Sequence, residues 1–221
     1  MHDEIEVLPP AASVDVWTYV DELIHRTLND YTVMHSSVQN TASRLRDTSS
    51  RTVLEDIAYR IRAQAIVQRL LRPPRDDGPR RLDADLTRLC AALSDTVLAE
   101  RKIGLTFFCR PATLQARRAW QTSLIVHELI MNAARHAFVE KDHGAIWLEM
   151  RQEAQYLRFD IADNGSASAA PAPGGGTAII DALVGDLGGE ISRTYSLYGS
   201  TACIRIPASH LLASARAAHA H

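Results

Sequence analysis

Four polar side chains that could act together lie in the segment HELIMNAARHAF, residues 127–138. At about 100° per residue, a helix would bring Glu128, Asn132, Arg135 and His136 to one side. An apolar stripe would occupy the other side: Val126, Ile130, Ala133 and Ala137. An oxygen ligand can hold a metal ion and basic groups can meet phosphate, so the set suits a magnesium-bound polyphosphate. An ordinary amphipathic helix gives the same pattern, and this stretch alone leaves both interpretations open.

Two segments downstream add weaker signals of the same kind. Asp163 ends the predicted strand QYLRFDIAD and precedes Asn164 and Gly165. A carboxylate there could accept a hydrogen bond from a base amine, although Asp-Asn-Gly is also a common turn sequence. Gly174 to Gly176 then open a predicted helix, where backbone amides can approach phosphate, although glycine runs are often only flexible. The order of these elements restricts the interpretation more than any one of them.

A third candidate lies near the N-terminus, in DELIHRTLND, residues 21–30. His25 follows Ile24, which belongs to an apolar stripe with helical spacing, so the histidine flanks that stripe. Glu22 lies three residues earlier. Most histidines on exposed helix faces have no chemical role, and the local sequence does not decide the question.

The elements that must position these residues fall into two groups. The spacing predicts helices over 13–46 and 51–72, a hairpin that would pair with a second copy into a four-helix bundle. RPPRDDGPR, residues 72–80, is predicted to be a linker because its prolines and glycine cannot continue a helix. The remaining pattern predicts helices over 82–101, 112–138 and 176–187, strands over 104–110, 145–151 and 155–163, and a final hairpin turning at Gly199. The predicted fold class is therefore α+β, with helices on one face of a sheet and domains over 13–72 and 82–208.

Composition excludes several classes of protein. The chain has 221 residues and a formal net charge of −2, which argues against a broad basic surface for nucleic acid. The three cysteines have neither metal-ligand spacing nor a disulfide framework, so a reducing cytoplasm is expected. No signal-peptide core and no run of about 18 apolar residues occur, so no membrane association is expected.

The motifs together resemble a known family. HELIMNAARHAF is similar to the N box of sensor histidine kinases, within the wider GHKL ATPase superfamily. DNG at 163–165 resembles the start of the first glycine box, GGGTAIIDALVGDLGGEI resembles a variant of the second, and YGSTACIRIP resembles the closing strand. ELIHRTLND is similar to the H-R-x-x-N phosphoacceptor box of one kinase subgroup. The resemblance covers roughly residues 15–207 and implies a Bergerat-type α/β sandwich ATPase domain after a dimeric helical hairpin.

The resemblance also implies a role for each matching residue. His25 would be the phosphorylated histidine, and Glu22 would orient or deprotonate its imidazole. Glu128 would act as a polarising carboxylate, and Asn132 would hold Mg²⁺. The other matching residues would bind ATP: Arg135 and His136 near phosphate, Asp163 at the adenine amine, Gly165 allowing close approach, and Gly174, Gly175, Gly176 and Thr177 bordering the nucleotide and its short lid, about 166–173.

The implied mechanism is phosphoryl transfer from ATP to the imidazole and then to an aspartate of a response-regulator receiver domain. Mg²⁺ and basic groups would neutralise the transferring charge, and the linker at 72–80 would let the nucleotide domain swing. The expected assembly is a homodimer. The chain shows no sensor domain, so a separate sensor protein is a possible partner, unless the chain is a fragment of a longer protein.

Departures from the family pattern leave other functions open. Ala167 replaces the usual second glycine of the first box, and Thr177-Ala178 replaces part of the Gly-Leu-Gly core of the second. These changes favour a histidine phosphotransfer adaptor with a degenerate nucleotide-binding domain, whereas Glu128 and Asn132 favour the kinase. A partner-switching serine kinase of the anti-sigma type is a third hypothesis, and the hairpin that carries His25 argues against it.

Overall fold

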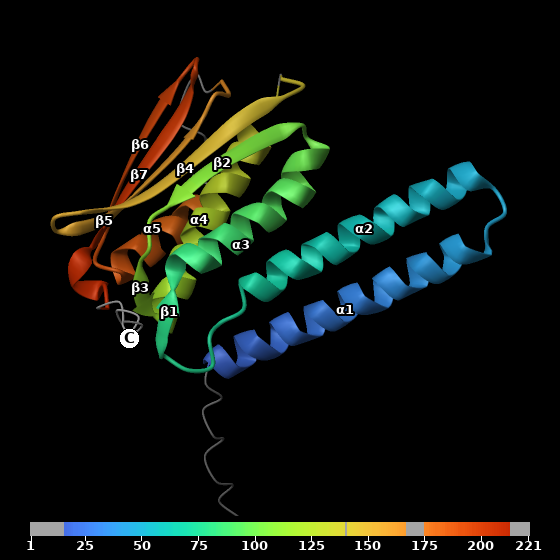
Figure 1. Cartoon of the computed structure of the whole chain (residues 1–221), viewed down its shortest axis with the longest axis horizontal. Coiled ribbons are helices and arrows are strands. Elements are labelled where there is room, and N and C mark those ends of the chain that lie inside the picture. The colour runs from blue at the N-terminus through green and yellow to red at the C-terminus, as the bar shows by residue number, and fades with distance from the viewer. Residues whose placement is uncertain (1–15, 140, 167–174, 213–221) are drawn as a thin grey trace, which may run out of the picture.

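The N-terminal part of the protein is an antiparallel helical hairpin. In the computed structural model, which describes residues 16–139, 141–166 and 175–212, α1 spans Val16–Arg44 and α2 spans Thr48–Leu70 (Figure 1). The side chain of Asp47 caps α2 by accepting a hydrogen bond of 2.8 Å from the Ser50 amide. The structure thus confirms both predicted helices: the first is shorter than predicted, and the second begins three residues earlier and ends two residues earlier. Residues 13–15 of the first prediction lie outside the described part of the chain.

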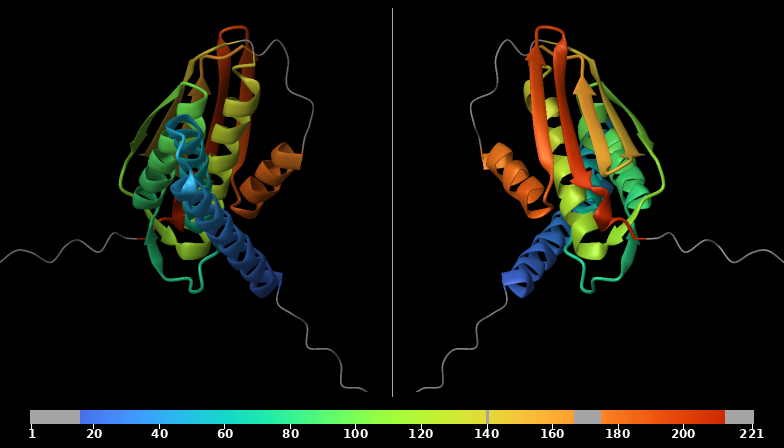
Figure 2. Two further views of the ribbon diagram at one scale, coloured as in Figure 1. Left: turned by 90° about the vertical axis from the view of Figure 1, so that its right-hand side faces the viewer. Right: turned by 90° about the vertical axis from the view of Figure 1, so that its left-hand side faces the viewer.

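The C-terminal part is a sheet with helices on one face. Its order is β2-β4-β5-β7-β6, and the pairs are antiparallel except for β2 with β4. The strands span Ile103–Cys109 (β2), Gly144–Glu153 (β4), Tyr156–Asp163 (β5), Glu190–Ser196 (β6) and Gly199–Pro207 (β7). The helices span Leu82–Leu93 (α3), Ala116–His136 (α4) and Gly175–Asp186 (α5). Figure 2 shows these helices on one side of the sheet, which confirms the predicted α+β class.

Strict alternation along the strands explains this one-sided packing. Ile146, Leu148 and Met150 of β4 point inward and are almost completely buried, and Phe159 of β5 is buried against them. The residues between them are more exposed; Trp147, for example, retains 43% of its accessible surface. Helices α3 and α4 supply the other half of this core through buried leucine, isoleucine and alanine side chains. The site-bearing helix α4 is therefore fixed firmly against the sheet.

Sequence periodicity missed a small second sheet. β1, Pro79–Arg81, pairs antiparallel with β3, Thr113–Gln115, so the predicted linker ends in a strand and the predicted helix 112–138 begins only at Ala116. The predicted helix 82–101 likewise continues beyond α3 as a π-helical segment, η1, Ser94–Leu98. Three-residue strands carry no measurable period, and their pairing depends on residues about 34 positions apart.

Several contacts hold the hairpin against the sheet domain. Trp120 Nε1 donates a hydrogen bond of 2.7 Å to the Leu71 carbonyl at the end of α2. Tyr59 on α2 donates through its hydroxyl to the Asp95 carbonyl at 3.0 Å, within η1. Arg60 lies 3.1 Å from the Glu100 carboxylate. The two parts are therefore packed along α2, although the linker sequence alone suggested free movement. No helix among the described residues is long and apolar enough to cross a bilayer.

Asp83 anchors the end of the linker, and replacing it by asparagine should destabilise the fold. Its carboxylate accepts hydrogen bonds from Arg81 Nε at 2.8 Å and from the Ala112 amide at 3.2 Å. The Arg81 hydrogen bond lowers the pKa of Asp83, so its ionic contribution is present above the unfolded pKa of about 4 and is lost as pH falls through the folded value. We expect Asp83→Asn to cost about 1 kcal/mol at pH 7 in chemical denaturation, and less below about pH 4.

The matched control for this change is Asp186→Asn, at the exposed end of α5, which should alter stability by less than about 0.5 kcal/mol. A cost for Asp83→Asn that stays constant from pH 7 to pH 3 would show that the charge on Asp83 does not stabilise the fold.

Candidate functional site

Glu128 and His127 form one corner of the candidate site, in the second half of α4. Glu128 is half-buried, and its Oε1 lies 3.3 Å from Nδ1 of His127. The hydrogen bond from His127 lowers the pKa of the Glu128 carboxyl, partial burial opposes this, and the nearby Arg135 guanidinium adds to the lowering. Glu128 is therefore a carboxylate at neutral pH, held in place by its neighbour.

Asn132 lies one helical turn after Glu128 and faces the same point in space. Gly176, in the first turn of α5, marks that point, because a Cβ atom built on it would lie 3.4 Å from Glu128 Oε2 and 3.6 Å from Asn132 Oδ1. The two side-chain oxygens thus converge on the N-terminal turn of α5. The free amides of a helix N-terminus favour anions. The sequence placed these residues in separate motifs, and the fold brings them together.

Asp163 forms a second corner, at the end of β5. Its carboxylate is buried and accepts hydrogen bonds from the Gly165 amide at 2.9 Å and the Ser200 amide at 3.3 Å, and also from the Ser200 hydroxyl. These bonds fix the orientation of the carboxylate. Because a carboxylate has about four acceptor positions, capacity remains for a donor such as an exocyclic amine. The predicted position of Asp163 at a strand end is confirmed.

Gly165 and Gly199 allow the backbone to close around Asp163. A Cβ on Gly165 would lie 2.2 Å from the Ala137 carbonyl oxygen, at the end of α4. The close approach there is thus between two backbone segments of the chain. Gly199 has a φ of 136°, and a Cβ on it would lie 1.9 Å from the Asp163 carbonyl oxygen. Both glycines are required by the shape of this corner.

Gly199→Ala is expected to destabilise the protein by at least about 2 kcal/mol, because the new Cβ clashes with backbone and the φ is unfavourable for alanine. Thermal or chemical denaturation measures this cost. Gly185→Ala is the matched control, since nothing lies within 4 Å of a Cβ built at that position and it occupies a helix, where alanine is favoured by about 0.5–1 kcal/mol. Equal stabilities of the two variants would contradict the close approach of β7 to Asp163.

The remaining candidate nucleotide residues lie at the end of α4 and in the first turn of α5. Arg135 and His136 are exposed at the end of α4, and Thr177 is half-buried in the first turn of α5. Gly175 is the first residue of α5. Gly174, Ala167 and the rest of the expected lid except Ser166 lie outside the described residues.

His25 lies on α1 and is exposed. Its Nδ1 is 3.3 Å from Nδ2 of Asn29, one turn further along the helix. Glu22 instead accepts a hydrogen bond of 2.8 Å from Arg26, and this bond lowers the pKa of the Glu22 carboxyl. The immediate polar neighbour of the imidazole is thus Asn29. The Asn29 side-chain amide can rotate so that either its nitrogen or its oxygen faces Nδ1 of His25. The nitrogen would donate to an unprotonated Nδ1 and the oxygen would accept from a protonated one, so Asn29 can pair with either tautomer.

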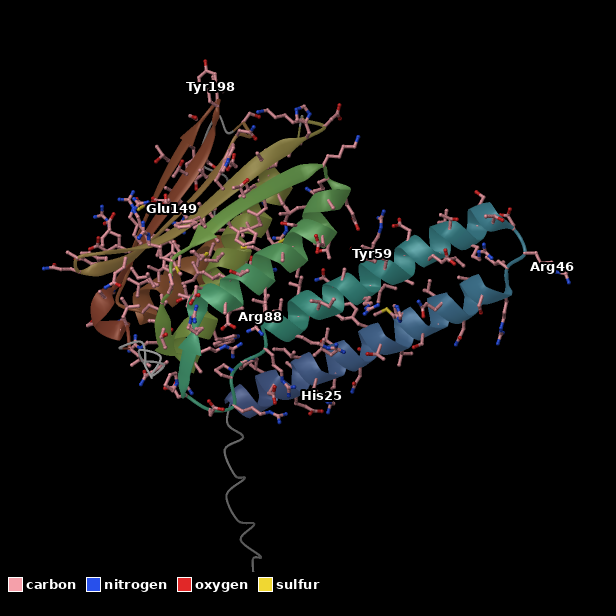
Figure 3. The ribbon with its side chains drawn as sticks, in the orientation of Figure 1. His25, Arg46, Tyr59, Arg88, Glu149 and Tyr198 are labelled. Atoms are coloured by element: carbon pink, nitrogen blue, oxygen red, sulfur yellow. The ribbon has the colours of Figure 1, made fainter. Side chains whose placement is uncertain are left out.

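His25 and the Asp163 corner of the candidate nucleotide site lie apart in this arrangement. Tyr198 precedes Gly199 and so marks the Asp163 corner. Figure 3 shows Tyr198 at the top of the view and His25 near the bottom. Contact between the Asp163 corner and His25 of the same chain therefore requires a change in this arrangement.

The residues present fit a magnesium ion bound together with phosphate. No cluster of three or more His, Cys, Asp or Glu side chains suited to a metal occurs among the described residues. Mg²⁺ does not need such a cluster, because it keeps several waters and binds through one or two protein oxygens plus substrate phosphates. Asn132 Oδ1 beside Glu128 Oε2 meets that requirement.

Two residues of the site were not found from the sequence. Ser200 was seen only as part of a strand, because its contact with Asp163 depends on the β5–β7 pairing, which no local pattern encodes. The contact of His127 with the Glu128 carboxylate was also not predicted. The position of His127 directly before the glutamate was the one available signal.

Two family models match the chain. Residues 22–97 match a model described as histidine kinase, and residues 91–194 match a model described as histidine kinase-like ATPase domain. Together they cover residues 22–194, which include most of the hairpin and most of the sheet domain. The first includes His25, and the second includes Glu128, Asn132 and Asp163.

Curated relatives and solved structures agree with these models. The sensor histidine kinase PdtaS of Mycolicibacterium smegmatis is 24% identical over 147 residues, which are 66% of this chain and 29% of the relative. PdtaS of Mycobacterium tuberculosis is 23% identical over the same lengths, so the chain spans less than a third of these relatives.

Among solved structures, the histidine kinase domain of the Erythrobacter litoralis blue-light activated kinase EL346 has a TM-score of 0.57 at 20% identity, covering 82% of this chain and 96% of that one. A bacterial phosphotransferase has a TM-score of 0.60 at 11% identity, covering 89% and 98%. At these identities the structures support the fold alone.

Proposed function

The chain belongs to the histidine kinase family and carries a GHKL-type ATPase domain, and from this we propose that it phosphorylates His25 from ATP and passes the phosphoryl group to a receiver-domain aspartate. The observation that carries the proposal is the convergence of Glu128 and Asn132 on the first turn of α5, on a chain that also presents an exposed histidine. Residues 13–72 would serve dimerisation and phosphotransfer, and residues 82–208 would bind nucleotide.

In the candidate nucleotide site, Asp163 would contact the adenine, and the first turn of α5 and the end of α4 would contact the phosphates. The remaining acceptor capacity of the buried Asp163 carboxylate suits the adenine amine, with Ser200 and Gly165 fixing its direction. The first turn of α5, with Gly175, Gly176 and Thr177, offers backbone amides to the phosphates. Arg135 and His136 are exposed nearby and can neutralise phosphate charge.

Asn132 would hold Mg²⁺, with the Glu128 carboxylate beside it polarising the reacting groups. When bound, the ion would supply positive charge to neutralise the negative charge that develops on the phosphates during transfer. The His127 hydrogen bond keeps Glu128 ionised, so the carboxylate is available to the ion or to a coordinated water. Removing either oxygen should weaken catalysis more than folding, since both side chains are only half-buried.

At the histidine, one imidazole nitrogen would use its lone pair to form the N–P bond with the γ-phosphorus of ATP. The bond from that phosphorus to the bridging oxygen breaks, and ADP leaves with the electron pair. The proton of the other ring nitrogen then passes to water or to a nearby carboxylate such as Glu22. Asn29 can hold the tautomer in which the attacking nitrogen is unprotonated, since its amide oxygen can accept the N–H of the other nitrogen.

Transfer requires the two sites to meet, either by a swing of the sheet domain or across a dimer. A dimer through α1 and α2 suits the exposed apolar side chains of the hairpin: Leu23, Val33, Met34, Val53, Ile57 and Ile66. The swing would break the Tyr59–Asp95 and Arg60–Glu100 contacts. A separate sensor protein could act by loosening these contacts. The cytoplasm is the compartment where a receiver domain would meet the chain.

The direct test incubates the purified chain with γ-labelled ATP, with Mg²⁺ or with a chelator, and then adds candidate receiver domains. We expect acid-labile, alkali-stable label on the chain only when Mg²⁺ is present, and its movement to a receiver. A chain that binds no nucleotide and acquires no label, alone or with candidate sensors, would refute the kinase assignment.

The second candidate is a histidine phosphotransfer adaptor. The observation that favours it is the departure of the glycine boxes from the family pattern, with Ala167 in place of a glycine and Thr177-Ala178 in place of part of the second core. An adaptor would accept phosphoryl groups at His25 from a phosphorylated receiver domain and would not require ATP. Label that enters from a phosphorylated receiver, but never from ATP, would select this function.

A further inference from the structure

A bidentate ion pair joins the start of the hairpin to the beginning of the linker. Arg72, two residues after α2, donates from Nε to Asp21 Oδ1 at 2.5 Å and from Nη2 to Asp21 Oδ2 at 2.8 Å. Both side chains retain 28% of their accessible surface. The pair ties residues 51 positions apart and therefore fixes the linker to α1.

A second arginine faces the same carboxylate. Arg75 Nη2 lies 3.8 Å from Asp21 Oδ2, and the Arg75 side chain is 77% exposed. Two guanidinium groups thus share one carboxylate. Guanidinium groups are suited to bind phosphate, because their planar N–H groups match its oxygens in pairs.

His25 lies one helical turn beyond Asp21, on the same side of α1. Side chains four residues apart on a helix have Cβ atoms about 5–6 Å apart. The Arg72 hydrogen bond lowers the pKa of Asp21, and His25 is near enough to contribute to that lowering. Figure 3 places His25 toward the end of α1 at which the linker leaves the hairpin.

We propose that Arg72 and Arg75 form the binding site for the phosphoryl group on His25, and that Asp21 occupies this site while His25 is unphosphorylated. The inference rests on the proposed function only in taking His25 as the modified residue. Arg72 and Arg75 are positioning residues: they hold the transferred group and are not part of the ATP site.

The proposed change of partner frees the linker from α1. When Arg72 moves from Asp21 to the phosphoryl group, the ion pair that joins α1 to the linker is broken. The new phosphoryl charge also repels the Asp21 carboxylate, one turn away, which favours the same change. Phosphorylation would therefore release the linker and give the sheet domain more freedom to move relative to His25.

The test loads the intact chain with phosphoramidate, which phosphorylates histidine without ATP, and titrates the phosphoryl group on His25 by phosphorus NMR. In the wild type, the two arginines favour the more charged form and lower the ionisation midpoint. We expect Arg72→Gln to raise this midpoint by about 0.3–0.7 pH units, Arg72→Lys to raise it less, and Asp21→Asn to lower it. Arg69→Gln, in the last turn of α2, is the matched control and should leave it unchanged.

A second measurement follows amide hydrogen exchange of residues 75–78, the linker residues that follow the two prolines. Exchange should rise on phosphorylation in the wild type, whereas in Arg72→Gln it should be high already and should not respond. Equal midpoints in the wild type and Arg72→Gln would overturn the inference, as would a failure of phosphoramidate to modify His25. Loss of labelling by ATP alone would refute the kinase and leave this inference standing, because phosphoramidate replaces ATP.

Discussion

His25→Ala should remove all acid-labile label that the chain acquires from ATP, a loss of at least about 100-fold. The imidazole is the nucleophile in the proposed transfer, and alanine offers no atom that could form the N–P bond. The side chain is exposed and its hydrogen-bonding contact is the one of 3.3 Å with Asn29, so its removal should leave the fold intact. Phosphorimaging after alkaline gel electrophoresis, with circular dichroism as the check on folding, measures both quantities.

His35→Ala is the matched control for this change. His35 lies on the same helix, ten residues later, and is half-buried. The His35→Ala variant should acquire label at the wild-type rate. If label survives in His25→Ala and disappears in His35→Ala, the phosphoacceptor is His35. Label that survives in both would place it elsewhere in the chain.

The main elements of the fold were predictable from periodicity, and the contacts between them were not. The apolar residues of α1 and α2 recur every three or four positions, which is the period of a helix. Those of β5 recur at every second position, which is the period of a strand. The pairing of β1 with β3 joins residues such as Arg80 and Leu114, and neither strand is long enough to show alternation. The Trp120–Leu71 and Tyr59–Asp95 hydrogen bonds depend on tertiary packing, which local spacing does not specify.

In the candidate site, too, the positions within one element were predictable and the contacts between elements were not. The helical spacing predicted that Glu128 and Asn132 share a face of α4, and the structure places them there, directed at Gly176. The partner of Asp163 could not be predicted, because Ser200 reaches it only through the register of β7 on β5. The prediction for Glu22 shows that helical spacing does not decide between two possible partners. Glu22 lies three residues before His25, which is compatible with contact, but its carboxylate binds Arg26, four residues after it.

The arrangement of the two sites is compatible with control of the proposed activity. Tyr198, beside the Asp163 corner, lies at the top of Figure 3, and His25 lies near the bottom. The contacts that hold this arrangement differ in burial. Tyr59–Asp95 and Arg60–Glu100 are largely exposed, and contacts of this type contribute about 0–1 kcal/mol each. The Trp120–Leu71 hydrogen bond is buried, and Val67 and Leu71 pack in the same apolar core as the sheet domain. A partner that competes for α2 could therefore break the two exposed contacts at small energetic cost, whereas full release of the sheet domain must also break the buried ones.

Asn132→Ala should reduce labelling from ATP by at least about 100-fold while the fold and the hairpin remain intact. A metal ion supplies several kcal/mol of charge stabilisation to phosphoryl transfer, and alanine removes its proposed protein ligand. The half-buried Asn132 makes no hydrogen bond among those found in the described part of the chain, so the fold should lose little stability. Initial rates over a range of Mg²⁺ concentrations measure the loss. Weakened metal binding should appear as a higher Mg²⁺ requirement.

Gln121→Ala is the matched control, because Gln121 carries the same amide on the same helix, is also half-buried, and lies well before the site. It should keep the wild-type rate and the wild-type Mg²⁺ dependence. Asn132→Asp separates ligation from packing: it keeps an oxygen at the same place, so it should retain part of the activity that alanine loses. If the Asn132→Ala variant acquired label from ATP as fast as the Gln121→Ala variant at every Mg²⁺ concentration, Asn132 would not be a metal ligand. The convergence of α4 on the first turn of α5 would then have only a packing role.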